Sequence, residues 1–591
     1  MKLSYSQIQG IVNKTDFSNY PKLHLLVLRN IMLEPIEPYY KYFAYQMGFD
    51  AHVRFGEYDN IYQEVVGRQP GLFHQDITCV IVFMKLETMS PDLSTNFTKL
   101  STSDIHNELE RIKGYIDAVL NSIREQSDAI ILWHGFEMPV YPELGVLDGQ
   151  SEHSHAATVG ELNRLLQQSL RRYKNAYFVD MNLCMARLGA GSFYDRRYWH
   201  IGRAPYSREA LCEIASEDFK YLRALKGKNR KCLVVDCDNT LWGGIIGEDG
   251  LEGIKMGKTY PGSQYYEFQQ EIVNLYHRGV IITLCSKNNE EDVLEVFRKH
   301  PDMVLKEEHI AAAQINWEDK ASNLRRLADD LNIGLSSMVL LDDSEFEINL
   351  VREMLPEVAI IHLPAGRAFE YRNILASCGL FDTLTITDED KRRATSYRAE
   401  SSRKKLQTQA TDMVRYYRSL EMVVEIRLAD DFSIPRIAQL TQKTNQFNLT
   451  TRRYSDADIK TMAENNNVDV FYIALKDRFG DSGIVGVCIL RYAGDEALVD
   501  IFLLSCRVLG RGVEDVFLIQ ALKLARKKGC RAVLGEYLPT IKNAQVENFY
   551  AQRGFVEIAT SGAGSGKRFR YEISGGIQPE PNFFQNIISD I

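Results

Sequence analysis

Short apolar runs alternate with amphipathic segments along the first 225 residues. The apolar runs, which predict strands buried on both faces, lie at 23–28, 77–84, 128–134 and 176–181. Apolar residues recur at helical intervals in segments between these runs, at 38–47, 103–124 and 159–172. Strands that alternate with helices form parallel sheets, so residues 1–225 are predicted to form one doubly wound α/β domain.

The alternation resumes after a basic, glycine-containing connector at 226–231, which marks the first predicted domain boundary. A second parallel sheet is predicted over residues 231–365, with buried-strand runs at 232–235, 279–285 and 339–341. Between the first two runs there is room for a glycine-rich flap, at 243–257, and one helix, at 264–277. There is no room for a large cap domain, so a ligand site on this predicted sheet is expected to be open to bulky substrates.

The rest of the chain has a different pattern. Residues 386–420 are polar with helical spacing, and Thr387 followed by Asp390 resembles a capping box, so this segment is predicted to be a helical connector. Antiparallel strands are predicted at 422–426, 470–475, 483–492 and 497–504, and a helix follows at 514–528. These elements predict a third, α+β domain over residues 421–575.

Length, composition and charge argue against several classes of protein. The chain of 591 residues is long enough for three domains and has an ordinary 45% of hydrophobic and 25% of charged residues. Its net charge of −9 argues against a nucleic-acid binder, and no apolar run reaches the ~18 residues of a membrane span. The N-terminal residues lack a secretory pattern and the ten cysteines are dispersed, so a cytoplasmic protein with reduced thiols is expected.

Two carboxylates follow the strand predicted at 232–235. Strand period places Asp236 and Asp238 on one side of the chain, at the carboxyl end of the strand, where α/β sheets bind ligands. Two like charges this close are costly unless a cation holds them, which favours Mg²⁺. Taken alone, the pair is equally typical of an Asp/Asn-rich turn.

Polar residues follow the later strand runs as well. Ser286 and Asn288 come directly after the second run, Lys320 precedes a helix, and Asp342 and Asp343 follow the third run. Separately, these residues could form a helix N-cap, a solvated charge and a loop. In this order, however, the aspartate pair, the hydroxyl, the lysine and the second aspartate pair resemble the four motifs of the haloacid dehalogenase (HAD) superfamily of phosphohydrolases.

The resemblance implies catalytic roles. Asp236 would attack phosphorus and form an aspartyl-phosphate, while Asp238 would protonate the leaving oxygen and then take a proton from the attacking water. Ser286 would donate a hydrogen bond to a phosphoryl oxygen, and Lys320 would balance the charge on the aspartate and the phosphoryl group.

The resemblance also implies a metal site. Asp343, favoured over Asp342, would hold Mg²⁺ together with Asp236 and the main-chain carbonyl of Asp238. The further positions expected to contact the substrate are Thr240 and Asn288.

Two longer strings narrow the resemblance: DCDNTLWGGIIGEDG at 236–250 and TQKTNQFNLTTRRY at 441–454. They resemble the FkbH-like subfamily, which implies handling of a glyceryl unit from 1,3-bisphosphoglycerate and its loading onto an acyl carrier protein. Asn445 and Asn448 are candidate substrate contacts, unless their loop caps the adjacent helix. Cys237 or Cys285 could accept the acyl group as a thioester, but strand alternation points both away from the aspartates and favours packed thiols.

The first domain resembles the SGNH hydrolase-like domain that precedes the phosphatase unit in FkbH-like proteins. Arg29-Asn30-Ile31 stands where an esterase would have its serine nucleophile, and Asp195 and His200 are five residues apart, so a D-x-x-H element is missing. We therefore expect this domain to be non-catalytic and to cover a site or dock a partner. His153 and His155 could bind a metal, but their polar loop favours solvated side chains.

A glycine turn opens the helix predicted at 514–528. Arg507, Gly510 and Gly512 form an R-x-x-G-x-G pattern, whose bare backbone N–H groups suit an anion such as a diphosphate, although a plain strand-to-helix turn looks the same. Together with NAQVENFYAQRGF at 543–555, the pattern resembles motifs A and B of the GCN5-related N-acetyltransferases (GNAT). The resemblance implies coenzyme A or a phosphopantetheine arm as a cofactor, with Tyr550 as general acid in an acyltransferase.

The sequence thus predicts a Mg²⁺-dependent phosphohydrolase of FkbH type that acts on a small phosphorylated metabolite and could pass an acyl or glyceryl unit to a carrier protein. The alternative is a fusion whose last domain is an acyl-CoA-dependent N-acyltransferase, in surface-polysaccharide or secondary-metabolite biosynthesis. In a third interpretation the chain is a non-enzymatic scaffold. Neither nucleic acid nor a membrane is expected as a partner.

Overall fold

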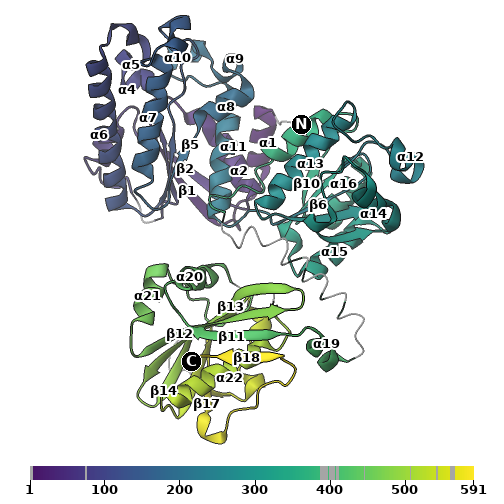
Figure 1. Ribbon diagram of the computed structural model, residues 1–591. Coiled ribbons are helices and arrows are strands. Elements are labelled where there is room, and N and C mark those ends of the chain that lie inside the picture. Colours follow the sequence, from purple (N-terminus) through teal and green to yellow (C-terminus); the bar gives the residue numbers. More distant parts are fainter. Residues whose placement is uncertain are drawn as a thin grey trace. The chain divides into compact units, whose positions relative to one another are not determined.

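The described residues of the chain form three separate β-sheets (Figure 1). The computed structural model describes residues 4–73, 76–386, 397, 399, 403, 406, 412–444, 446–505, 508–540, 543–558 and 566–591. The chain divides into two compact units, Met1–Asn229 with Gly379–Leu384, and Arg230–Cys378 with Thr385–Ile591. Most of the predicted connector, including its capping box, lies outside the described residues.

The first unit is built on a parallel sheet with strand order β2-β1-β3-β4-β5. Its strands are β1 (Lys22–Arg29), β2 (Asp50–Phe55), β3 (Cys79–Phe83), β4 (Ile130–His134) and β5 (Ala176–Val179). Its helices are α1 (Tyr5–Lys14), α2 (Glu37–Gln46), α3 (Ile61–Val65), α4 (Leu86–Met89), α5 (Pro91–Thr95), α6 (Thr102–Gln126), α7 (His155–Leu170), α8 (Met181–Leu188), α9 (Ala190–Phe193), α10 (Arg196–Gly202) and α11 (Arg208–Leu225).

The central strands β1, β3 and β4 are mostly apolar because both of their faces are buried. Leu25 and Val27 of β1 pack into a core with α2 and α11, whereas Leu26 and Leu28 pack into a second core with α6 and α7. The predicted strands and helices are confirmed to within a few residues. Strand β2 was not predicted, because it lies at the sheet edge and most of its residues are partly exposed, which removes the apolar signal.

The second sheet is also parallel, with strand order β10-β9-β6-β7-β8. Its strands are β6 (Cys232–Val235), β7 (Ile281–Ser286), β8 (Ile310–Ile315), β9 (Met338–Asp342) and β10 (Ala359–His362). Its helices are α12 (Ile246–Gly253), α13 (Gly262–His277), α14 (Glu290–Lys299), α15 (Lys320–Leu331), α16 (Glu345–Met354) and α17 (Tyr371–Ser377). The predicted flap is closed at its base by antiparallel pairing of Gly243 with Lys255, and it carries the short helix α12. The direction of chain progression reverses between β6 and β9, which is where open α/β sheets place their ligands.

The third sheet is mostly antiparallel, with strand order β16-β17-β15-β14-β13-β12-β11-β18. Its strands are β11 (Val423–Leu428), β12 (Val468–Asp477), β13 (Gly480–Ala493), β14 (Glu496–Leu504), β15 (Ala532–Tyr537), β16 (Val556–Ile558), β17 (Lys567–Glu572) and β18 (Asn586–Ser589). Its helices are α19 (Met413–Ser419), α20 (Ile434–Lys443), α21 (Asp456–Ala463) and α22 (Val513–Lys527). Strand β18 lies beyond residue 575, where the sequence pattern had placed the end of this domain.

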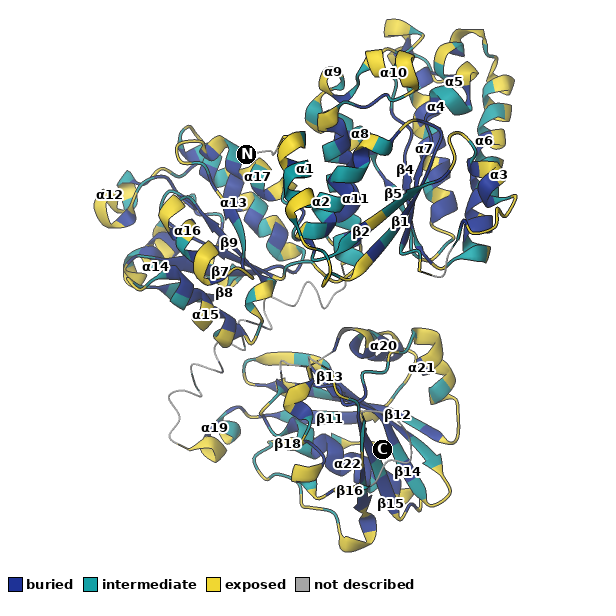
Figure 2. Cartoon of the chain, turned by 180° about the vertical axis from the view of Figure 1, so that it is seen from behind, coloured by how far each residue is buried: buried dark blue, intermediate teal, exposed yellow. Residues whose placement is uncertain are grey.

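Helix α22 and helices α20 and α21 cover opposite faces of this sheet. Residues of α22 join one apolar core with β12, β13 and β14, and residues of α20 and α21 join a second core on the other face of the same strands. Figure 2 shows α22 almost wholly buried, as befits a helix with apolar residues on most of its surface. Among the described residues, no helix has both the length and the apolar character that a membrane crossing requires.

Candidate active site

The candidate active site lies at the carboxyl ends of β6 and β9. These strands pair in parallel, with Val235 opposite Leu341, and the backbone N–H of Asp236 donates to the carbonyl of Leu341 at 3.1 Å. This pairing brings Asp236 next to Asp342 and Asp343. The three side chains each offer a carboxylate oxygen, and these oxygen atoms all lie within 4.8 Å of one another.

Three carboxylates this close repel one another. Asp236 is 6% exposed and Asp342 is fully buried. Burial, and then the charge of Asp236, raise the pKa of Asp342 above its usual range and that of Asp343 to about 6. A divalent cation would relieve this repulsion, and a set of carboxylate oxygens suits Mg²⁺. The residues present therefore fit the Mg²⁺ that the sequence predicts.

Lys320 supplies a fixed positive charge beside this cluster. It is the first residue of α15, whose N-cap Asp319 accepts a hydrogen bond from the backbone N–H of Ser322. The Nζ atom of Lys320 lies 2.8 Å from Oδ1 of Asp236 and also contacts Oδ2 of Asp342. Burial alone would lower the pKa of Lys320, but the charges of Asp236 and Asp342 outweigh burial and raise it. The lysine therefore stays charged, as its expected role requires.

Asp342 and Asp343 differ in the number of hydrogen bonds and ion pairs that their carboxylates already form. Oδ1 of Asp342 accepts from the backbone N–H of Ser344 at 2.9 Å, and its Oδ2 contacts Lys320. Asp343 accepts one long hydrogen bond, at 3.4 Å, from the hydroxyl of Thr240. Asp343 is therefore the freer of the two to bind a metal. Thr240, expected to contact the substrate, is fully buried and supports Asp343.

Asp238 is held apart from the cluster by three donors. Its Oδ1 accepts from the indole N–H of Trp242 at 2.9 Å and from the backbone N–H of Ile246 at 3.0 Å, and its Oδ2 accepts from the Asn288 amide at 2.8 Å. Burial raises the pKa of Asp238 more than these donors lower it. A carboxyl group with a raised pKa, fixed beside the cluster, suits proton transfer. Asn288, expected to contact the substrate, positions Asp238.

Sequence reasoning missed the residues that anchor the flap. Trp242 is fully buried, and the amide nitrogen of buried Gln269 donates to the carbonyl of Leu241 at 2.8 Å. The amide oxygen of Gln269 accepts from the backbone N–H groups of Val304 and Leu305, at 2.9 and 3.0 Å. The glycines of the flap were visible in the sequence, but these contacts join segments distant in the chain and left no local pattern.

The thiols and the hydroxyl of this region are buried. Ser286 is 2% exposed at the end of β7, and its hydrogen bond with Cys237 lowers the pKa of that thiol less than burial raises it. Burial also raises the pKa of Cys285 to about 12. Both cysteines are completely inaccessible, which confirms their interpretation as packed thiols. Neither can accept an acyl group from a substrate in this conformation.

At the corresponding edge of the first sheet, Asn30, Arg29 and Asp195 have structural partners. The side chain of Asn30 joins the ends of β1 and β3, since its amide donates to the carbonyl of Lys85 at 3.1 Å and accepts from the Lys85 N–H at 2.7 Å. Arg29 donates to the carbonyl of Gly56 at 2.6 Å, and Asp195 caps the helix that contains His200. These side chains therefore hold strand ends and a helix end in place.

His153 and His155, which the sequence offered as a possible metal-binding pair, lie in different surroundings. His153 is exposed, but His155 is buried and stacks on Phe97 with ring centroids 4.9 Å apart. The expectation that both are solvated was wrong for His155, because it begins α7 and packs beneath the loop. Among the described residues, the only cluster of three or more potential metal ligands is the aspartate cluster at β6 and β9.

The glycine turn of the third sheet is filled from within the chain. Gly510 and Gly512 have positive φ angles of 72° and 74°, and α22 begins at Val513 as predicted. However, the hydroxyl of Tyr417 donates to the carbonyl of Gly510 at 2.8 Å, and the ring of Phe583 packs so close to Gly512 that an added Cβ would lie 2.5 Å from it. Side chains from distant parts of the chain therefore pack against the described part of this turn.

Charged groups at the turn are also unsuited to a diphosphate. The carboxylate of Glu514 faces the backbone N–H groups of Gly510 and Glu514, which lower its pKa, although burial outweighs them and raises it. The guanidinium of Arg511 is buried and lies 3.4 Å from Asp477. The carboxylate of Glu514 thus lies near backbone N–H groups of the turn that the sequence assigned to a bound anion.

The remaining candidates in this region are buried or not described. Tyr550 is 1% exposed, and its hydroxyl has no hydrogen-bond partner among the described residues. Asn448 is fully buried, with its amide oxygen accepting from the N–H of Thr451 at 2.9 Å and its amide nitrogen donating to the carbonyl of Thr444 at 3.3 Å. Asn448 thus holds its own loop. Asn445 and Arg507 lie outside the described residues.

Comparison with known proteins gives partial matches. No family model and no curated protein match the sequence. The structure is similar, with a TM-score of 0.59 and 27% identity, to the N-terminal part of the protein BF1531 from Bacteroides fragilis, which contains a phosphatase domain and was crystallised with Mg. That match covers 65% of this chain and 100% of the other.

Acetyltransferases match a smaller part. The ribosomal-protein-S18-alanine N-acetyltransferase from Escherichia coli matches with 16% identity and a TM-score of 0.21, over 27% of this chain and 97% of its own. Spermidine N-acetyltransferase from Vibrio cholerae, in complex with CoA and spermine, matches with 14% identity and a TM-score of 0.21, over 26% of this chain and 96% of its own. By these comparisons, about two thirds of the chain is similar to the N-terminal part of a protein that contains a phosphatase domain.

Proposed function

We propose that the chain is a Mg²⁺-dependent phosphohydrolase of FkbH type that acts on a small phosphorylated metabolite. The observation that carries the proposal is the cluster of Asp236, Asp342 and Asp343 with buried Lys320, at the reversal point of the second sheet. The similarity to a phosphatase-domain protein that was crystallised with Mg supports it.

Each step is assigned to a side chain already in place. Asp236 would attack phosphorus and carry the phosphoryl group, while Lys320, 2.8 Å from its carboxylate, would offset negative charge. Asp238, with its raised pKa, would donate a proton to the leaving oxygen and then accept one from the attacking water. Asp343 and Asp236 would hold Mg²⁺, which when bound neutralises charge on phosphoryl oxygens.

A substrate-panel screen tests this function. Phosphate release from a panel of phosphorylated metabolites and from p-nitrophenyl phosphate is measured with Mg²⁺ and with excess chelator. We expect release that requires Mg²⁺ and falls to background in Asp236→Asn. Release by Asp236→Asn at the wild-type rate would refute the assigned nucleophile, and no release from any compound would favour the scaffold interpretation.

We further propose that the thiol of a carrier protein attacks the acyl carbon of an acyl phosphate, so that a thioester forms, phosphate leaves, and the acyl or glyceryl unit passes directly to the carrier. Direct transfer is favoured because Cys237 and Cys285 are inaccessible. Labelled 1,3-bisphosphoglycerate is incubated with several holo-carrier proteins, and label on the pantetheine arm is measured. Label carried instead by Cys237 of the chain would contradict direct transfer. The alternative of an acyl-CoA-dependent N-acyltransferase is weakened by the filled glycine turn and by inaccessible Tyr550.

A further inference from the structure

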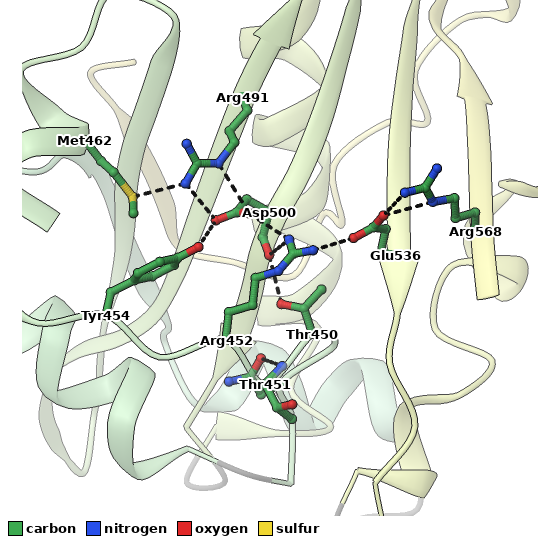
Figure 3. A network of polar contacts seen from close by, with 10 residues as sticks. Thr450, Thr451, Arg452, Tyr454, Met462, Arg491, Asp500, Glu536 and Arg568 are labelled. Carbon is green, nitrogen blue, oxygen red and sulfur yellow. Dashed lines mark hydrogen bonds and ion pairs between the residues drawn. The ribbon is translucent and has the colours of Figure 1, made fainter. Parts of the chain in front are cut away.

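A network of arginines and carboxylates lies where strands β14 and β15 separate (Figure 3). The two strands pair in parallel from Glu496 and Ala532 to Val499 and Gly535, and no further. The next residues along each strand are Asp500 and Glu536. Asp500 is also the residue skipped where β14 shifts register against β13, which marks a bulge. Both carboxylates therefore lie at the point of divergence.

The carboxylates are buried, whereas the guanidinium groups around them are partly exposed. The side chains of Asp500 and Glu536 are 7% and 8% exposed, and those of Arg452, Arg491 and Arg568 are 33%, 38% and 56% exposed. The acidic groups thus form the floor of the network and the basic groups its outer surface. A ligand arriving from solvent meets positive charge first.

Arg452 joins the two carboxylates. Its Nη1 donates to Oδ1 of Asp500 and its Nη2 donates to Oε2 of Glu536, each at 2.7 Å, and Figure 3 shows its guanidinium between them. The hydroxyl of Thr450 donates to the carbonyl of Asp500 at 2.8 Å. The loop that carries Arg452 is therefore fixed across the gap between the strands.

Two further arginines approach from the sides. Arg491 of β13 lies with its Nε 3.3 Å from Oδ1 of Asp500, and Arg568 of β17 donates from Nε to Oε1 of Glu536 at 2.9 Å. Oδ2 of Asp500 also accepts from the hydroxyl of Tyr454 at 2.7 Å. Among the described residues, the Nη1 atoms of Arg491 and Arg568 donate no hydrogen bond.

The charges of this network do not balance. Three guanidinium groups, always protonated, face two carboxylates, which leaves one positive charge uncompensated. A network that served only to tie strands together would not need the third arginine or the outward Nη1 groups. Guanidinium forks match the oxygen atoms of carboxylates and phosphates, so the uncompensated charge suits an oxyanion.

We propose that Arg452, Arg491 and Arg568 form an oxyanion-binding site on the third domain, which takes the phosphate or carboxylate group of a small ligand. The site is distinct from the glycine turn, whose anion position is already filled by Glu514. It does not depend on the phosphatase function. Arg570 lies on β17, two residues from Arg568, but its charge is compensated. It pairs with two carboxylates, Glu496 and Glu572.

Arginine footprinting tests the site without any substitution. The full-length chain is treated with phenylglyoxal in the presence of inorganic phosphate, acetate or chloride at equal ionic strength, and modification of each arginine is followed by mass spectrometry. We expect phosphate or acetate to slow modification of Arg491 and Arg568 at least about threefold relative to chloride, with Arg570 unaffected. The more protective anion identifies the ligand group. Equal rates in all three salts, or equal protection of Arg570, would overturn the proposal.

A matched pair of variants provides a second test. Binding of inorganic phosphate to the full-length chain is measured by calorimetry without Mg²⁺, in wild type, Arg491→Met and Arg570→Met. We expect Arg491→Met to weaken binding about tenfold, because it removes a charged donor, and Arg570→Met to leave it unchanged. Unchanged binding in a folded Arg491→Met would contradict the site. If that variant fails to fold, the footprinting result decides.

Discussion

Substitution of Asp238 by asparagine separates proton transfer from metal binding. The asparagine side chain would keep one oxygen to accept from Trp242 and Ile246, and would lose the ability to accept from the Asn288 amide. A hydrogen bond to a charged group contributes about 1.5–3 kcal/mol, and one between neutral groups about 0.5–1.5 kcal/mol. The variant would weaken the hydrogen bonds from Trp242 and Ile246 and lose the one from Asn288, which together costs a few kcal/mol. Removing a buried charge next to Asp236 offsets much of this, and we expect the variant to fold with a stability loss below about 2 kcal/mol.

The expected loss lies in turnover. An amide cannot donate a proton to the leaving oxygen or accept one from water, and general acid–base catalysis contributes about 10²- to 10⁴-fold, or ~3–5 kcal/mol. Mg²⁺ affinity should stay within about threefold of wild type, because no carboxylate oxygen of Asp238 belongs to the cluster. Turnover is measured as phosphate release and Mg²⁺ binding by calorimetry. A near wild-type turnover rate, or a loss of Mg²⁺ binding, would refute the role assigned to Asp238.

Three further substitutions give distinct outcomes. Asp343→Asn should weaken Mg²⁺ binding at least about a hundredfold in calorimetry. Removing a residue that only hydrogen-bonds to a metal ligand already weakens metal binding about 10–100-fold, and Asp343 is proposed to be a ligand itself. Unchanged affinity would assign the metal to Asp342 instead. Lys320→Met should lower the free energy of unfolding by about 3–5 kcal/mol in urea with chelator, with part restored by Mg²⁺, because it leaves buried carboxylates unpaired; no loss would refute the pairing. Gly535→Ala should cost about 1–3 kcal/mol in thermal unfolding, because its Cβ would lie 2.5 Å from the buried ring of Tyr550; an unchanged melting temperature would contradict this packing.

The carboxyl ends of β6 and β9 could be located from the sequence because both strands are continuous apolar runs. A parallel strand buried on both faces ends visibly where polar residues begin, and the side chains just beyond the ends must gather at one edge of the sheet. The sequence therefore predicts that Asp236, Asp342 and Asp343 gather at one site, and their carboxylate oxygens lie within 4.8 Å of one another.

Contacts between distant segments could not be predicted in this way. Nothing local in the sequence indicates that the indole of Trp242 and the amide of Asn288 would hold Asp238. Likewise, the glycine turn has the pattern of an anion site, but only the fold shows that Glu514 and Phe583 fill it. The arginine network escaped notice because its members come from a loop and from strands β13 and β17, and no short motif contains them all.

The flap has a fixed root and an exposed tip. Its root is fixed to Asp238, since the backbone N–H of Ile246 donates to the Asp238 carboxylate and the side chain of Trp242 is buried. Its tip, residues 247–250, is exposed and takes no part in those contacts. Under the proposed function, substitutions at the tip would therefore change substrate selectivity and leave the position of Asp238 unchanged.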